Sequence, residues 1–197
     1  VILHGLTFEE AQGDALSVLG CRNVAVERCE IRNIRRRAIH LDGGAHNLIA
    51  GCNIHDTGTG GIYLGGGDRK TLTPAGHVLE DSRIWKFSVH QLTYASAIHL
   101  SGVGNVARHN LIHDAPHQAV SVHGNDHLFE YNVVSNVCVA SDDAAAFYKG
   151  RNPSCRGNVL RYNLWSEIGS PRGHGNAAVY FDDGDGGDTV APGPQAR

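Results

Sequence analysis

The sequence predicts an all-β solenoid of about seven parallel coils, and two observations carry this prediction. Apolar residues recur in the same phase through six segments, in units of about 22–36 residues along a chain of 197. Within each unit, apolar and polar residues alternate with period 2, which is typical of a strand with one buried face. Helical periodicity of 3.6 is absent. Repeats of this length that hold only strands indicate stacked coils rather than a closed globular sheet.

The first strand of each unit follows from one shared pattern. With the second residue of a segment as reference, the residues three before it and two after it are apolar in every unit. The segments are RCEIRN (28–33), GCNIHD (51–56), DSRIWK (81–86), HNLIHD (109–114), YNVVSN (131–136) and YNLWSE (162–167). Leu3, Leu6 and Phe8 fit as an earlier, degenerate member.

A second set of apolar residues interleaves with the first and predicts a second strand in each unit. Its first members are Leu16, Ile39, Ile62, Ile98, Val120, Phe147 and Val179. We therefore predict a right-handed, single-stranded parallel β-helix over residues 1–187, followed by an irregular or truncated tail over 188–197. A leucine-rich repeat lacks its Leu/Asn consensus here, and a β-propeller needs four strands per blade.

Equivalent residues of neighbouring coils are expected to stack about 4.8 Å apart. Asn110 and Asn132 then form an amide ladder. Cys29 and Cys52 share the same position, where they serve as small apolar fillers, with a disulfide between them as the alternative. Five Cys without a CxxC motif indicate neither a zinc motif nor a complete disulfide framework.

The connections between the two strands are longer in three units and mark one edge of the solenoid. The two strands' inward residues are 8 residues apart in four units but 13 or 14 apart in three others. Loops 85–97, 135–146 and 166–178 are therefore expected to border one face, because solenoids place insertions on a binding face. A separate insertion, 65–76, lies on the other side of the second strand.

The outward positions of the second strand carry the candidate binding residues. Small residues there, such as Ala97, Ala119 and Ala146, are expected to floor a trough that suits an extended polar ligand such as a sugar chain. A solvated polar sheet face is the alternative. Lys149 breaks the inward pattern, and either bends out to solvent or reaches the trough. The assigned substrate-binding residues are His99, His117, His123, Tyr148, Lys149 and Tyr180.

Two acidic clusters supply the candidate catalytic residues: Asp142 with Asp143, and Asp182 with Asp183. Glycosidic bond cleavage needs paired carboxylates, one to protonate the leaving oxygen and one to attack or to activate water. Asp-rich turns are also common simply as turns, and clustered oxygens bind Ca²⁺. The turn or ion interpretation is favoured for Asp185 and Asp188. No regular ligand spacing supports a metal site formed by His40, His99 and His123.

Residues 123–163 and 176–187 resemble the pectate-lyase-like right-handed β-helix superfamily, and within it the group around glycoside hydrolase family 141, which includes α-L-fucosidases and xylanases. The resemblance is good over 105–187 and generic over 1–104. It implies two catalytic aspartates about forty residues apart on neighbouring coils, one from each doublet, with Asp142 and Asp183 as the preferred pair. Ala145 stands where related proteins often carry Gly.

The leading functional hypothesis is therefore a glycoside hydrolase that cleaves plant or algal polysaccharide. The alternatives are a Ca²⁺-dependent polysaccharide lyase, with Lys149, Arg151 or Arg156 as base, and a non-catalytic glycan-binding solenoid. A hydrolase requires no cofactor, although Ca²⁺ is compatible. A net charge of −3 argues against a nucleic-acid partner. No apolar stretch reaches membrane-spanning length. Without an initial Met, the chain is expected to be part of a longer, secreted or periplasmic, monomeric protein.

Overall fold

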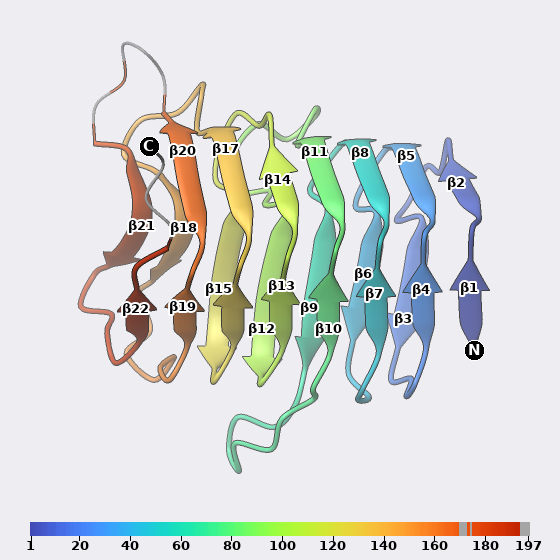
Figure 1. The fold of residues 1–197 in the computed structure, drawn as a ribbon, viewed down its shortest axis with the longest axis horizontal. Coiled ribbons are helices and arrows are strands. Elements are labelled where there is room, and N and C mark those ends of the chain that lie inside the picture. Colours follow the sequence, from blue (N-terminus) through green and yellow to red (C-terminus); the bar gives the residue numbers. More distant parts are fainter. Residues whose placement is uncertain (170–172, 174, 194–197) are drawn as a thin grey trace.

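A computed structural model describes residues 1–169, 173 and 175–193, and it shows three parallel sheets wound into a solenoid (Figure 1). Sheet A contains β1 (Ile2–His4), β4 (Ala25–Glu27), β7 (Leu48–Ala50), β10 (Val78–Glu80), β13 (Val106–Arg108), β16 (Leu128–Glu130), β19 (Val159–Arg161) and β22 (Thr189–Ala191). Sheet B contains β2 (Thr7–Glu9), β5 (Glu30–Ile34), β8 (Asn53–Thr57), β11 (Arg83–Phe87), β14 (Leu111–His113), β17 (Val133–Val137) and β20 (Leu164–Ile168). Sheet C contains β3 (Leu16–Leu19), β6 (Ile39–Asp42), β9 (Ile62–Gly66), β12 (Ile98–Val103), β15 (Val120–Asn125), β18 (Ala145–Gly150) and β21 (Ala177–Asp182).

Each coil contributes one strand to each sheet, so the chain winds through A, B and C seven times, as the sequence predicts. Figure 1 shows the coils side by side, with the N-terminal coil at one end of the solenoid and the C-terminal coil at the other. Strand β22 then starts an eighth turn by pairing with β19. The regular pairing therefore extends to Ala191, and the remainder of the tail predicted over 188–197 lies partly outside the described residues.

A coil holds three strands rather than the two expected, because the first predicted strand is bent into two. The bend falls on the residue before the reference position of each segment, and these residues have positive φ: Arg28, Gly51, Asp81, His109, Tyr131 and Tyr162. A single residue in the left-handed region turns the chain sharply without a loop. The apolar residues on both sides of the bend still point inward, so the alternation alone did not reveal the corner.

The predicted buried column is confirmed. Backbone pairing aligns Leu16, Ile39, Ile62, Ile98, Val120, Phe147 and Val179 in consecutive strands of sheet C. Ile39, Ile62, Ile98 and Val120 are completely buried, and Val179 packs partly buried against the same core. Burial of one aliphatic side chain contributes about 1.5–3 kcal/mol, so stacked columns provide most of the solenoid's cohesion.

Inward-facing polar side chains form a ladder at the corner between sheets A and B. Ser82, Asn110, Asn132 and Asn163 each accept a hydrogen bond from the backbone N–H of the reference residue one coil earlier, at 2.9–3.1 Å. The Asn110–Asn132 ladder predicted from the sequence is therefore confirmed. Cys29 and Cys52 occupy the preceding rungs as buried free thiols, which agrees with the small-filler interpretation and excludes the disulfide in this structure.

A second ladder, not anticipated from the sequence, lies just before the strands of sheet A. Its side-chain acceptors alternate between amide and imidazole and end in a carboxylate. Each accepts a hydrogen bond from a backbone N–H of the preceding coil at 2.9–3.2 Å: Asn47, His77, Asn105, His127, Asn158 and Asp188. The sequence does not reveal this ladder, because Asn and His are different residue types. Both nevertheless place a planar acceptor, the amide Oδ1 or the imidazole Nδ1, at the same distance from the backbone.

Replacing Asn132 by Ala should lower the free energy of unfolding by about 3 kcal/mol, because the buried donors of Asn110 would lose their acceptor. The Asn132 Oδ1 now accepts from both the backbone N and the Nδ2 of Asn110 at 3.0 Å. Urea unfolding followed by circular dichroism measures the loss. Asn53→Ala, at an exposed position of β8, is the matched control. Equal stability of both variants would contradict a structural role for the ladder.

The second ladder should also make the fold sensitive to acid. Burial lowers the pKa of His127 to about 3, and its Nδ1 must stay unprotonated to accept the Asn105 N–H at 3.1 Å. Because the folded pKa lies below the ordinary value of about 6.5, this stabilisation is complete above pH 6.5 and is lost as the pH falls towards 3.

The expected result is that His127→Asn, which keeps an acceptor that does not titrate, shows a shallower loss of stability between pH 6.5 and 3 than the wild type. Thermal unfolding at a series of pH values measures this. His4→Asn, at an exposed position, should keep the wild-type slope. A His127→Asn profile parallel to that of the wild type would rule the ladder out as the source of the acid sensitivity.

Candidate functional site

The outer face of sheet C carries one continuous row of polar and aromatic residues. Backbone pairing places these residues in register, one from each coil: Ser17, His40, Tyr63, His99, Ser121, Tyr148 and Tyr180. The alternation in the sequence therefore places these residues on the outer face correctly. Most of them are half-buried, because each side chain leans on its neighbour in the next coil.

In the first half of the row, aromatic rings stack on one another. Tyr63 lies between His40 and His99, with ring centroids 4.8 and 5.1 Å apart, and the Arg37 guanidinium lies 5.6 Å from the Tyr63 centroid. His99 Nδ1 is 2.6 Å from Ser121 Oγ. Burial, assisted by the Arg37 charge, lowers the pKa of His99 to about 4. His99 is thus a neutral hydrogen-bonding group at neutral pH.

In the second half of the row, two tyrosines connect with the acidic residues. The Tyr148 hydroxyl donates to Asp182 Oδ2 at 2.8 Å, from one coil to the next. Tyr180 lies close enough to Asp143 for the negative charge of that carboxylate to act on its hydroxyl. The two rings meet edge to face, with centroids 6.2 Å apart. We call Asp143, Tyr148, Tyr180 and Asp182 the tyrosine–aspartate cluster.

Gly150 makes this arrangement possible. It pairs with Asp182 across β18 and β21. A Cβ at Gly150 would lie 2.8 Å from the Asp182 Cβ and 3.0 Å from the Tyr148 hydroxyl oxygen. Both contacts are too short for a real side chain, so only glycine lets the phenol reach the carboxylate.

The electrostatics of the cluster keep both phenols protonated at neutral pH. Burial, together with the hydrogen bond to Asp182, raises the pKa of Tyr148 to about 12. The negative charge of Asp143, and then that of Asp182, raises the pKa of Tyr180. The Tyr148 hydroxyl is therefore a fixed donor to Asp182, and it holds this carboxylate on the outer face of sheet C.

The two aspartate doublets lie at opposite ends of the same pair of strands. Asp142 and Asp143 precede β18, whereas Asp182 ends β21 and Asp183 follows it. The strand between Ala145 and Gly150 alone spans about 16 Å, so stacking of coils does not bring the backbones of the doublets together. Tyr180 lies between them, within the electrostatic influence of Asp143, Asp182 and Asp183.

The second members of the doublets have different surroundings. Asp183 forms an ion pair with Arg151, Nε to Oδ2 at 2.9 Å, and both side chains are more than half exposed. Asp142 is an exposed residue of the loop that leads into β18. Tyr148 therefore contacts Asp182 in the second doublet, and Asp143 of the first doublet acts on Tyr180.

His123 lies on the same outer face, two residues beyond Ser121 along β15, where it aligns with Ser101 of β12. Its Nε2 is 3.3 Å from Arg69 Nη1. Arg69 comes from the insertion after β9, which projects from the solenoid on the side opposite the long loops (Figure 1). The guanidinium also donates to Asn125 and Ser154 at 2.9 Å. It therefore fixes this insertion against the later coils.

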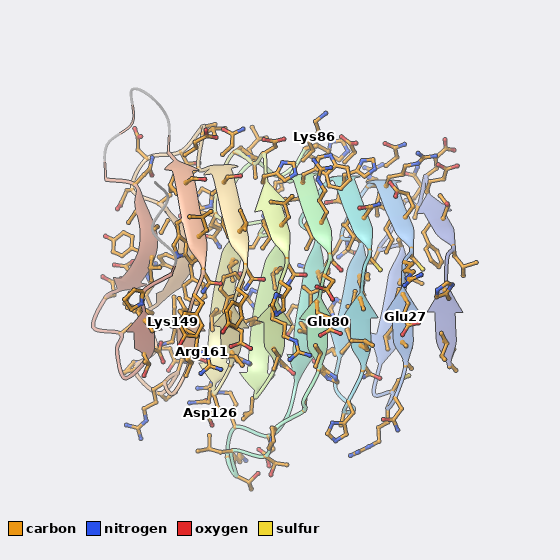
Figure 2. The ribbon with its side chains drawn as sticks, in the orientation of Figure 1. Glu27, Glu80, Lys86, Asp126, Lys149 and Arg161 are labelled. Atoms are coloured by element: carbon orange, nitrogen blue, oxygen red, sulfur yellow. The ribbon has the colours of Figure 1, made fainter. Side chains whose placement is uncertain are left out.

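Lys149 does not belong to the site, contrary to the sequence prediction. Its side chain is 1% exposed and points inward, where Nζ lies 2.7 Å from Asp185 Oδ1 and 2.8 Å from Asp188 Oδ2. Figure 2 marks Lys149 near the C-terminal end of the solenoid. The two carboxylates are also fully buried and compensate the buried charge. Snorkelling is therefore unnecessary, and these two aspartates bind an ammonium group rather than an ion from solution.

His117 and the row of small residues are also placed differently from the prediction. His117 is 8% exposed, and its ring contacts Tyr94 of the preceding long loop, with centroids 5.1 Å apart. Ala97, Ala119 and Ala146 are completely buried and belong to the hydrophobic core. They lie where the chain turns from sheet B into sheet C, so their side chains face inward and do not floor a trough.

The long connections do share one edge, between sheets B and C. Residues 88–97 join β11 to β12, and 138–144 join β17 to β18. Figure 1 shows these connections on one side of the solenoid, and Lys86 marks that edge in Figure 2. The third predicted loop, 166–178, falls partly outside the described residues. Among the described residues, no group of three or more His, Cys, Asp or Glu side chains is arranged to hold a metal ion.

Comparisons with known proteins agree with this architecture. The family model for the right-handed β-helix region matches residues 1–74. The chain has a right-handed parallel β-helix fold. Among solved structures, the β-helix is similar to a protein described as a glycoside hydrolase, with a TM-score of 0.60 and 11% sequence identity. The similarity covers 89% of this chain and 38% of that one. No curated protein matches the β-helix.

Two features of the β-helix near the site were missed at the sequence level. Arg69 is the only arginine in the insertion after β9. A cation in an insertion next to a strand of sheet C is a sequence feature that could have indicated a contact with the outer face. Gly150, directly after Tyr148 and Lys149, marks a place where a neighbouring side chain approaches the backbone.

In the described part of the chain, no helix is long and apolar enough to span a membrane.

Replacing Asp182 by Asn should lower the pKa of Tyr148 from about 12 towards the ordinary tyrosine value of about 10, because the charged acceptor would be lost. Ultraviolet difference titration at alkaline pH measures tyrosine ionisation. Asp81→Asn, at an exposed corner position, should leave the titration unchanged. An unshifted Tyr148 in Asp182→Asn would show that the phenol does not bind this carboxylate in solution.

Proposed function

We propose that this β-helix is a carbohydrate-active enzyme that hydrolyses glycosidic bonds of a polysaccharide on the outer face of sheet C. The observation that carries the proposal is the tyrosine–aspartate cluster. Asp182 accepts a hydrogen bond from Tyr148 of the neighbouring coil, and the charge of Asp143 acts on Tyr180 of the neighbouring coil. Glycoside hydrolysis requires a pair of acids of this kind. The fold shared with a protein described as a glycoside hydrolase supports the same class of substrate.

Asp143 and Asp182 are the proposed catalytic pair. The hydrogen bond from Tyr148 fixes the Asp182 carboxylate in one orientation, and Asp143 lies within electrostatic reach of Tyr180. Fixed donors and acceptors do not need to reorganise during the reaction, which lowers its barrier. One of the two acids protonates the leaving oxygen and the other activates the attacking group.

Asp143 precedes β18, whereas Asp182 pairs with Gly150 at the end of the same strand. The separation of the two carboxyl groups in the substrate complex would decide the stereochemical outcome. A retaining mechanism needs about 5–5.5 Å, and an inverting mechanism with an intervening water needs about 6.5–9.5 Å.

A polymeric substrate is proposed because the polar row continues beyond the cluster. His99 and Ser121 extend it on the N-terminal side, and His123 lies beside it. Neutral imidazole, hydroxyl and phenol groups form hydrogen bonds with sugar hydroxyls without demanding a charge. At about 4.8 Å per coil, a chain that runs along the solenoid axis meets a new polar side chain at every coil.

The structure removes one argument for a lyase. Lys149, one of the three candidates for the base, is buried between two carboxylates and does not reach a substrate on the surface. Arg151 is exposed but ion-paired with Asp183. A hydrolase therefore accounts better for the residues at this face than a lyase does.

Asp143→Asn and Asp182→Asn should each reduce the rate of polysaccharide hydrolysis by about 10³-fold, the scale of general acid–base catalysis. Reducing-end release from a glycan panel measures the rate, and circular dichroism confirms the fold. The controls are Asp142→Asn and Asp183→Asn, which change the neighbouring acids and should retain most activity.

Proton NMR of the first product formed distinguishes retention from inversion of the anomeric configuration. If the two proposed variants hydrolyse at the wild-type rate, Asp143 and Asp182 are not the catalytic pair. If the wild type binds glycans but releases no reducing ends, the non-catalytic binding solenoid replaces the hydrolase. Release of unsaturated products, detected by their ultraviolet absorbance, would identify a lyase instead.

A further inference from the structure

A cavity of about 820 Å³ lies at the corner between sheets B and C in the first four coils, well away from the tyrosine–aspartate cluster. Each of these coils contributes to its wall, in the turn that follows β2, β5, β8 or β11. The centres of the two regions are about four coils apart, or about 19 Å along the axis at 4.8 Å per coil. A volume of this size lies within the range of small-ligand sites.

The outer wall of the cavity is built by the long loop 88–97. Three backbone hydrogen bonds tie its start to the preceding coil: Val89 N to Thr57 O at 3.0 Å, and His90 N and Gln91 N to Gly58 O at 3.0 and 2.9 Å. Gly58 has no space for a side chain, because a Cβ there would collide with the Arg35 carbonyl and the His90 ring. The wall is therefore preformed rather than assembled around a ligand.

The charged groups of the cavity balance. Glu10 and Asp56 provide two carboxylates, and Arg35 and Arg36 provide two guanidinium groups. Asp56 Oδ2 is 2.6 Å from His55 Nδ1, which holds this carboxylate in place. A strongly anionic ligand would meet the two acids, and a cationic ligand would meet the two arginines. The balance favours an uncharged ligand.

The remaining lining is suited to hydroxyl groups above an apolar surface. Gln12, Asn33 and Thr59 offer amide and hydroxyl groups, while Ala11, Ile34 and Val89 provide aliphatic contacts. Arg35 Nη1 donates to Gln12 Oε1 at 3.3 Å, so two of the polar groups are already positioned. Polar groups that converge around an apolar patch match a sugar ring, which has hydroxyls at its rim and C–H groups on its faces.

We propose that this cavity is a second carbohydrate site, which binds uncharged sugar units of a glycan and takes no part in bond cleavage. Carboxylates and guanidinium groups serve here as acceptors and donors for sugar hydroxyls. Because the site lies about four coils from the tyrosine–aspartate cluster, one long glycan can occupy both, and linked binding raises the overall affinity for polymers. The proposal does not depend on hydrolysis by the cluster.

The test measures binding apart from catalysis. Isothermal titration calorimetry with neutral xylo-, gluco-, manno- and fuco-oligosaccharides is carried out on a protein that carries Asp143→Asn and Asp182→Asn. In this background, Glu10→Gln removes a charged acceptor, and Ala11→Trp fills the cavity. Each should weaken binding of the best oligosaccharide at least tenfold, or remove one of two binding steps. Arg32→Ala changes an arginine of the next coil that lies outside the cavity and pairs with Glu9, and this variant should bind normally.

Hydrolysis of a short soluble substrate by Ala11→Trp in the otherwise wild-type protein should be unchanged, which separates this site from the proposed catalytic one. Wild-type affinity and stoichiometry in both cavity variants would overturn the proposal. So would the absence of binding to every neutral oligosaccharide. Binding restricted to uronate or sulfated oligosaccharides, weakened by salt, would also overturn it, because the ligand would then be an anion.

Discussion

The in-register stacking of one coil on the next is the constraint on which the rest of the structure depends. Two ladders of inward polar side chains set this register, because each rung accepts the backbone N–H of the coil before it. Apolar columns alone do not fix the register of neighbouring coils, because Ile, Val and Phe replace one another within a column. A one-residue slip would send every core side chain to the surface, and it would also break both ladders at once.

The outer face inherits its geometry from this register. Tyr148 reaches Asp182 only because Gly150 and Asp182 are paired across β18 and β21. The same pair of strands is fixed from inside by Lys149, which alternates with Tyr148 along β18 and meets Asp185 and Asp188 in the core. Asp188 is at the same time the last acceptor of the second ladder. The site and the interior are therefore connected by a single strand whose two faces carry the two networks.

The period-2 alternation of the sequence correctly predicted the buried column through Ile62 and Ile98. It also predicted the outer row through His99 and Tyr148. Both features depend only on neighbouring residues in the chain. The alternation did not predict the third strand of each coil, since a single left-handed residue such as Tyr131 bends the chain without changing the alternation. Lys149 was misplaced for a different reason. Its burial depends on Asp185 and Asp188, which lie more than thirty residues away, and partners at that distance leave no local pattern. The contact of Tyr148 with Asp182 likewise joins residues of different coils.

The direction of the ladders has a consequence for the order in which the chain is completed during synthesis. The backbone N–H of Asn105 finds its acceptor in His127, and that of His127 in Asn158. The backbone donor of each coil therefore has no acceptor until a residue 22–31 positions later has been translated. At a ribosome, the newest coil always carries an unsatisfied donor that the emerging chain is about to satisfy. Winding therefore proceeds in the direction of translation, with every coil serving as the template for its successor.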